Sequence, residues 1–295
     1  MVNASPTRKR GTTLGADSLV CASGWYVLFY RTTPAPARTI FRLMSIPLDQ
    51  SATTTPAMEV HLLGSLDFDA HERLQQRLVY EAGGRADGQI TLLICEYRPI
   101  ITVGRAGSYD HLRLEPGELE ARQMELRWVG RGGGCMIHGP GQVVVNLIVP
   151  LDVLGWTVGE YLDRLQVGLV STLQSLGIKS HTRGAAHGIW GRVGQLAALG
   201  VAVKHGTAYH GAYINVAPKM DLYQYVDTDP LANSPMSCLL AQRGQPIKMT
   251  SVRAALAPHL AEALDCPRYH LHTGHPLLAE TRRDCNLEGS SKRAS

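Results

Sequence analysis

The sequence has few of the features that mark metal-binding, disulfide-bonded or membrane-spanning proteins. Its six cysteines form no C-x-x-C pair and no zinc-type array with histidine, which indicates reduced thiols and no structural metal. Aromatic residues account for only 6% of the chain, and the apolar run from Leu19 to Tyr30 is shorter than the about 20 residues that cross a bilayer. Asp17 precedes that run and no clean small-x-small cleavage motif follows it, which argues against a secretion signal. These absences predict a globular, cytoplasmic protein.

Net charge is also missing from most of the chain. The formal charge is +4, and residues 1–56 carry six basic and two acidic side chains, so the remainder sums to zero. A protein that coats nucleic acid needs an extended basic surface. We therefore expect no nucleic-acid partner, and we further expect a monomer that binds no membrane.

One folded domain is expected between two polar ends. Residues 1–56 are rich in Ser, Thr, Pro and Arg and lack periodicity, which predicts a disordered or misannotated extension with Met44 or Met58 as alternative starts. Residues 276–295 have the composition of a disordered tail. This leaves residues 57–275 as a single domain without internal repeats.

Strands and helices are predicted to mix without strict alternation. The capping box Thr157-x-x-Glu160 begins a helix with leucines at helical spacing, and Asp67 or Asp69 caps another that ends at Gly83-Gly84. The near-continuous apolar run 142–149 suits a strand buried on both faces. Further strands are expected at 59–63, 90–95, 100–103, 126–129, 195–203 and 208–216, and further helices at 116–124 and 251–264. The pattern favours an α/β (α+β) fold with a central mixed β-sheet and packed helices over a doubly wound fold.

The stretch from Gly130 to Gly141 is the most unusual in the sequence. It reads Gly-Arg-Gly-Gly-Gly-Cys-Met-Ile-His-Gly-Pro-Gly. Glycines at this density let backbone amides approach a ligand closely, and they leave Arg131 and His138 as the polar side chains. The stretch matches neither a P-loop nor a dinucleotide fingerprint. A structural turn between two strands is an equal alternative on composition alone.

Cys238 is the candidate nucleophile. It follows the polar segment 234–237 at a predicted junction between a loop and a helix, where a thiol can be activated. Three histidines could activate it or could equally be hydrogen-bonded structural residues: His138, His205 and His210. Cys135, in the glycine-rich stretch, is the rival candidate. Cys95, in an apolar strand, and Cys266, at a helix end, have no comparable polar neighbours in the sequence.

Five segments resemble the lipoyl(octanoyl) transferase family in their order along the chain. They are Pro99 to Arg105, Arg131 to Gln142, Gly188 to Trp190, Ala197 to Val201, and Tyr209 to Val216. The resemblance covers about residues 58 to 265. The string Arg-Gly-Gly followed by His-Gly-Pro-Gly-Gln is its most specific part.

This resemblance implies a fold like that of biotin and lipoate protein ligases and a two-step acyl transfer. A cysteine takes an octanoyl group from octanoyl-acyl carrier protein and passes it to a lysine of a lipoyl domain, without nucleotide, metal or other cofactor. The acceptors are lipoyl domains of 2-oxoacid dehydrogenase E2 subunits and the glycine cleavage H protein. Cys238 aligns with the family cysteine. The positions that align with the acyl pocket are Arg131, Gly132, Gly133, Gly134, Cys135, Met136, Ile137 and His138, then Ala198, Leu199 and Gly200, then Gly211, Ala212 and Tyr213.

Two positions depart from the family pattern. Gln195 stands where the family has a lysine that activates the thiol and can act as a base, and a glutamine can neither carry charge nor accept a proton. Loss of a positioned base costs about 10²- to 10⁴-fold in rate. The second departure is Met236-Ser237-Cys238-Leu239 in place of Pro-Cys-Gly. Lys204 lies at the far end of the same predicted strand with opposite parity, so His138 or His210 is the expected substitute base.

Three hypotheses follow from this pattern. The first is an octanoyltransferase that uses Cys238 and an altered dyad. The second is a catalytically impaired relative that binds acyl carrier protein or lipoyl domains without turnover. The third is an acyltransferase for a different thioester.

Overall fold

The structure is a computed structural model that describes residues 56–114, 116–184, 186–228 and 235–278. Residues 1–55 of the predicted N-terminal extension and residues 279–295 of the predicted tail lie outside these ranges. Residues 276–278, which the tail prediction included, form a helical turn, and Leu277 and Leu278 pack against the core. Among the described residues, no helix combines the length and the apolar character needed to cross a bilayer.

An eight-stranded mixed sheet forms the centre of the described domain. Its strands are β1 (Ala57–Leu66), β2 (Ile90–Tyr97), β6 (Gln142–Pro150), β7 (His181–Arg183), β8 (Ala186–Gly191), β9 (Gly194–Lys204), β10 (Thr207–Asn215) and β11 (Arg268–Thr273). Their order across the sheet is β11-β1-β2-β6-β10-β9-β8-β7. β1 runs parallel to β2 and β11, and every other neighbouring pair is antiparallel. The predicted fold class is therefore confirmed.

A second, three-stranded sheet carries the end of the glycine-rich stretch. It consists of β3 (Ile100–Val103), β4 (Glu125–Trp128) and β5 (Cys135–His138), in the order β4-β3-β5. β3 is parallel to β4 and antiparallel to β5. β5 was not predicted, and all four of its residues are buried. The stretch is thus a loop, 130–134, that leads directly into a buried strand.

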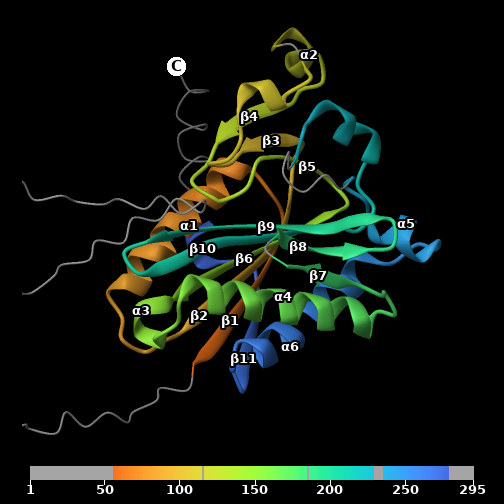
Figure 1. Cartoon of the computed structure of the whole chain (residues 1–295). Coiled ribbons are helices and arrows are strands. Elements are labelled where there is room, and N and C mark those ends of the chain that lie inside the picture. Colours follow the sequence, from red (N-terminus) through yellow and green to blue (C-terminus); the bar gives the residue numbers. More distant parts are fainter. Residues whose placement is uncertain (1–55, 115, 185, 229–234, 279–295) are drawn as a thin grey trace, which may run out of the picture. The chain divides into compact units, whose positions relative to one another are not determined.

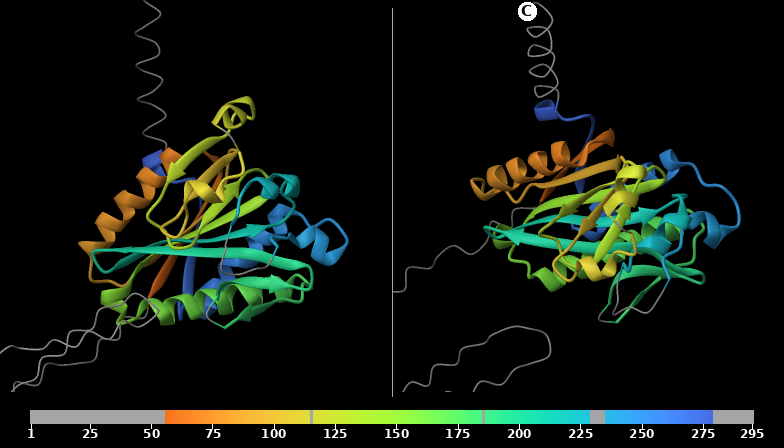
Figure 2. Two further views of the ribbon diagram at one scale, coloured as in Figure 1. Left: turned by 45° about the horizontal axis from the view of Figure 1, so that its top comes forward. Right: turned by 90° about the horizontal axis from the view of Figure 1, so that it is seen from above.

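Helices cover both faces of the large sheet. They are α1 (Phe68–Gly83), α2 (Pro116–Ala121), α3 (Leu151–Leu154), α4 (Val158–Ser175), α5 (Leu239–Arg243) and α6 (Met249–Ala263), with the 3₁₀ turns η1 (Tyr109–His111) and η2 (Met220–Tyr225). In Figure 1, α4 and α6 lie on one face, whereas α1 and the small sheet lie on the other. Figure 2 shows α1 and α4 on opposite sides of the sheet.

The caps of the two long helices follow from their sequences. Asp67 accepts a hydrogen bond from the amide of Ala70 at 3.0 Å and so caps α1. Thr157 and Glu160 form the predicted capping box of α4. Both helices therefore begin where the sequence indicated.

Side chains of β6 alternate between the two faces of the large sheet. Val144 and Ile148 pack toward α1. The alternate positions pack toward α4 and α6: Val143, Val145, Leu147 and Val149. Because both faces are covered, the strand is apolar at nearly every position.

Candidate active site

A small cavity lies where the glycine loop meets the large sheet. It is lined by Arg131, Gly133, Gly134, Met136, His187, Gln195, Ala198, Leu199, Tyr213 and Thr228. Its volume of about 30 Å³ admits a water molecule or two and is too small for an eight-carbon chain. The fold thus brings Gln195 together with residues from all three stretches that the family resemblance places at the acyl pocket. His187 and Thr228 also line it and were not predicted.

Close backbone packing places the glycine loop against its neighbours. A Cβ atom at Gly104 would lie 2.4 Å from the carbonyl oxygen of Gly133, and one at Gly200 would lie 2.6 Å from that of Gly132. The amide of Gly132 also donates to the carbonyl of Val201 at 2.9 Å. Glycine is required at 104 and 200 because backbone approaches there to within a distance that no side chain permits.

Other residues that were predicted to line the pocket pack elsewhere in the fold. Gly211 packs against the carbonyl of Val145, and Ala212 belongs to the core on the α4 side of the sheet. Cys135 and Ile137 point into a separate apolar cluster of the small sheet. None of these residues lines the cavity.

Arg131 is a buried cation with backbone and hydroxyl acceptors. Its side chain is 2% exposed and donates to the carbonyls of Gly132 and Gly134 at 3.0 and 3.1 Å. It also donates to the carbonyl and the hydroxyl of Thr102, at 3.1 and 2.7 Å. Burial lowers the pKa of the guanidinium, although arginine stays protonated in proteins. Its Nε is buried and has no hydrogen-bond partner in the described structure, so one donor of the guanidinium is unpaired.

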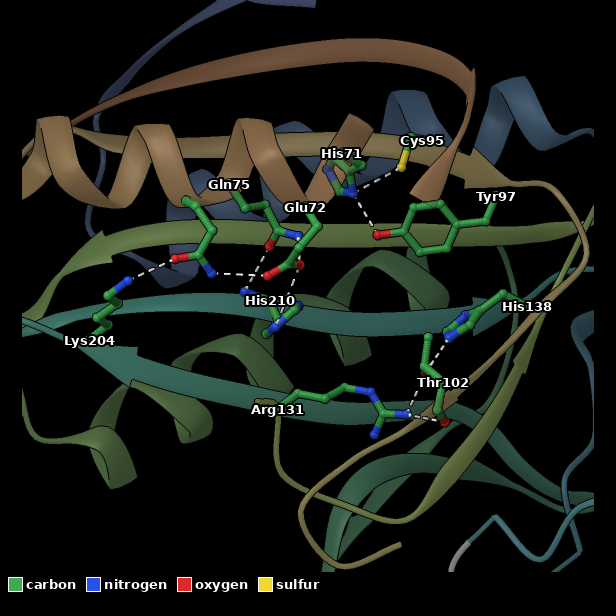
Figure 3. Close-up of polar contacts among 11 residues, drawn as sticks. His71, Glu72, Gln75, Cys95, Tyr97, Thr102, Arg131, His138, Lys204 and His210 are labelled. Atoms are coloured by element: carbon green, nitrogen blue, oxygen red, sulfur yellow. Dashed lines mark hydrogen bonds and ion pairs between the residues drawn. The ribbon is translucent and has the colours of Figure 1, made fainter. Parts of the chain in front are cut away.

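A chain of buried hydrogen bonds begins at Arg131 (Figure 3). The hydroxyl of Thr102 lies 2.8 Å from Nε2 of His138, and Nδ1 of His138 lies 2.7 Å from Oε1 of Gln142. Arg131 can only donate, so Thr102 accepts from it. Oε1 of Gln142 can only accept, so His138 carries its proton on Nδ1, and the Nε2 of the neutral ring accepts from the Thr102 hydroxyl.

The chain of hydrogen bonds continues to Ser237, the residue before Cys238. Nε2 of Gln142 donates to Oδ1 of Asn215 at 3.0 Å, and Nδ2 of Asn215 donates to the carbonyl of Ser237 at 3.1 Å. The carbonyl of Ile137 also accepts from Nε2 of Gln142, at 3.1 Å, which identifies that atom as the amide nitrogen. In each link of this chain the donor lies on the Arg131 side and the acceptor lies on the Ser237 side. Hydrogen bonds aligned in this way strengthen one another.

His138 is held as a neutral structural residue in this chain. Burial lowers its pKa to about 3, and the charge of Arg131 contributes further. Both ring nitrogens are engaged, and its ring packs on Tyr97 and Tyr213 with centroids 5.3 and 4.6 Å away. No nitrogen of His138 is free to take a proton from a substrate.

Cys238 lies at the predicted junction, as the N-cap residue of α5, and is 4% exposed. The segment before it pairs with the first residues of β9: the amide of Gln195 donates to the carbonyl of Pro235 at 2.9 Å, and the amide of Ser237 donates to that of Gln195 at 2.8 Å. Burial raises the pKa of Tyr223. The Cys238 backbone is therefore attached to the strand whose side chains line the cavity.

The other described cysteines are buried thiols with raised pKa values. Burial raises the pKa of Cys95 and Cys135, and it raises that of Cys266 to about 12. Cys135 lies 3.7 Å from the carbonyl oxygen of Ser108, on the far side of β5 from the cavity. These surroundings disfavour the reactive thiolate.

His210 belongs to a second polar cluster beneath α1 (Figure 3). Its φ angle of 62° lies in the left-handed region, and its amide donates to Oε1 of Gln75 at 3.1 Å. Its Nε2 lies 4.0 Å from the Glu72 carboxylate, and burial lowers the pKa of the imidazole to about 3. Lys204 bonds Oε1 of Gln76 at the exposed end of this cluster. Neither His210 nor Lys204 lines the cavity.

The side chain of Gln195 is buried and donates weakly to the carbonyl of Ala197 at 3.3 Å. It supplies no charge to the cavity. Among the described residues, no group of three His, Cys, Asp or Glu side chains is arranged to hold a metal ion.

Comparison with known proteins identifies the fold and the family. The family model of the lipoyl protein ligase A/B catalytic domain matches residues 68–261. The octanoyltransferase of Pseudomonas fluorescens strain SBW25 is 32% identical over 213 residues, which cover 72% of this chain and 94% of that protein. That of Geobacter metallireducens is 31% identical over 221 residues, or 74% and 99% of the two chains.

Solved structures share the fold at low sequence identity. ATP-bound lipoate-protein ligase A has a TM-score of 0.60 at 14% identity and covers 77% of this chain and 94% of its own. A bipartite lipoate protein ligase of Thermoplasma acidophilum, studied with its E2 lipoyl domain, has a TM-score of 0.57 at 15% identity over 77% and 91%. The family match and the curated relatives show that this chain belongs to the lipoyl protein ligase A/B catalytic domain family of enzymes.

Proposed function

We propose that this chain is a cytoplasmic octanoyltransferase of protein lipoylation. It takes an octanoyl group from octanoyl-acyl carrier protein onto Cys238 and passes it to a lysine of a lipoyl domain, in an E2 subunit or the glycine cleavage H protein. The observation that carries the proposal is the attachment of the Cys238 segment to Gln195, which lines the cavity of the glycine loop. The relatives named octanoyltransferase support the acyl group, and the neighbour studied with an E2 lipoyl domain supports the acceptor.

Two exchanges at one carbonyl carbon complete this reaction. In the first, the Cys238 sulfur forms a bond to the acyl carbon while the bond to the carrier sulfur breaks, and the carrier thiolate takes up the proton that Cys238 lost. In the second, the acceptor nitrogen replaces the Cys238 sulfur, which leaves as a thiolate and is reprotonated. The free Nε–H of Arg131 is a candidate donor to the oxyanion in both steps.

The acyl chain needs more space than the cavity has in this structure. Met136 and Leu199 line it, and both are apolar. Methionine adopts many rotamers at low cost, so we expect Met136 to move when the chain enters.

Intact mass spectrometry tests the proposal. Protein incubated with octanoyl-acyl carrier protein should gain one octanoyl group that hydroxylamine removes, and the group should pass to an added lipoyl domain. Cys238→Ala should abolish the adduct and Cys135→Ala should retain it. An adduct that persists in Cys238→Ala would contradict the assignment of the nucleophile.

The uncharged Gln195 supports one alternative, a binder of acyl carrier protein or lipoyl domains without turnover. This alternative predicts that either partner binds wild type and Cys238→Ala equally, with no adduct in either. If Gln195→Lys then gains transfer activity, the chain is an impaired enzyme whose missing part is the lysine. If wild type already turns over, the alternative is wrong.

A further inference from the structure

Transfer to a lysine requires a proton acceptor because the amine, with a pKa of about 10.4, is an ammonium ion at neutral pH. Few cavity side chains can accept a proton. Arg131 stays charged, and burial raises the pKa of Tyr213 to about 12. Gln195 and Thr228 have no basic atom. His187 is the one imidazole among the described residues that line the cavity.

The position of His187 suits this task. It lies on β8, and the next residue, Gly188, pairs with the cavity residue Ala198 on β9. A Cβ atom at Gly188 would lie 2.4 Å from Nε2 of Gln195, so the glutamine amide covers the backbone directly beside His187. His187 and Gln195 thus line the same cavity.

Accessibility separates His187 from the two histidines that were predicted to act as bases. His138 and His210 are 1% exposed, whereas His187 is exposed and its imidazole has no hydrogen-bond or ion-pair partner among the described residues. A lysine carried by another folded protein can reach only a base at the mouth of the cavity.

We propose that His187 is the general base that deprotonates the acceptor lysine, an inference that rests on the proposed octanoyltransferase function. An imidazole nitrogen of His187 takes one proton from the ammonium group. The neutral amine then forms the C–N bond as the bond to the Cys238 sulfur breaks, and the second nitrogen proton passes to the thiolate. The imidazolium releases its proton to water.

The test separates the two half-reactions. Cys238 is first loaded with octanoyl-acyl carrier protein, and a lipoyl domain is then added while the loss of the adduct is followed by mass. His187→Ala should load at the wild-type rate and transfer about 10²-fold more slowly at neutral pH. His187→Gln should behave like His187→Ala because glutamine keeps size without basicity. His181→Ala, a matched exposed histidine on β7 outside the cavity, should transfer normally.

Two further measurements exclude a merely structural effect. Added imidazole should restore part of the rate of His187→Ala. The gap between variant and wild type should close as the pH approaches the amine pKa of about 10.4, where the lysine needs no base.

The outcomes distinguish this proposal from the one on which it rests. If wild type forms no adduct, the octanoyltransferase function fails and the inference fails with it. If wild type loads and transfers but His187→Ala transfers equally fast, the inference alone is overturned. Equal slowing of loading and transfer, without imidazole rescue, also overturns it.

Discussion

Asn215→Ala tests whether the hydrogen-bond chain positions Cys238, the proposed nucleophile. The asparagine is fully buried, and its Nδ2 holds the carbonyl of Ser237. After truncation, Gln142 and Tyr223 can both still bond the carbonyl of Ile137, at 3.1 and 3.3 Å. The carbonyl of Ser237 alone loses its partner.

The unpaired carbonyl of Ser237 determines the expected losses of stability and of rate. An unsatisfied buried acceptor costs about 1–3 kcal/mol of stability. The segment before Cys238 then keeps its pairing with Gln195 but loses its bond to Asn215. A displacement of about 1 Å at a reacting group can cost about 10²-fold in rate. We therefore expect a lower free energy of unfolding and a fall in octanoyl loading larger than the loss of folded protein explains.

Urea unfolding and the rate of adduct formation measure the two effects on the same samples. Tyr223→Phe is the matched control, because it removes a hydroxyl from the same cluster and leaves the Asn215–Ser237 bond in place. It should lower stability by about 0.5–1.5 kcal/mol and load nearly normally. Wild-type loading in folded Asn215→Ala, or equal slowing in both variants, would refute the positioning role.

Three other changes have defined outcomes. Gly200→Ala puts a Cβ atom 2.6 Å from the Gly132 carbonyl oxygen and should destabilise the fold by about 1–3 kcal/mol in thermal unfolding, whereas Gly84→Ala, with its nearest atom at 3.6 Å, should change little. His71, His138 and His210 have pKa values lowered by burial from 6.5 to about 3, so the unfolded chain binds more protons and stability should fall as the pH drops from about 6.5 toward 3. The urea midpoint measured over that range should decrease, and a flat profile would contradict the burial. Cys95→Ala should retain octanoyl loading, because that thiol packs in the core beneath α1; loss of loading in folded protein would be inconsistent with this.

The sequence by itself determined the local elements and the family. The cap at Asp67, the capping box at Thr157 and the two-faced strand 142–150 follow from short-range patterns, because helix caps and strand periodicity depend on neighbouring residues. The glycine-rich motif predicted the loop that forms one wall of the cavity. The buried strand β5 was not predicted, because glycines directly precede it and glycine is depleted in strands.

The tertiary structure decided which polar residues meet. Hydrogen bonds in the chain from Arg131 to Ser237 join residues 29, 36 and 73 positions apart, and only the register of the sheets brings such partners together. The sequence offered His138 and His210 as bases, yet both are enclosed by packing from other segments. His187 reaches the cavity because β8 pairs with β9. Burial depends on what packs over a residue, which spacing along one chain does not reveal.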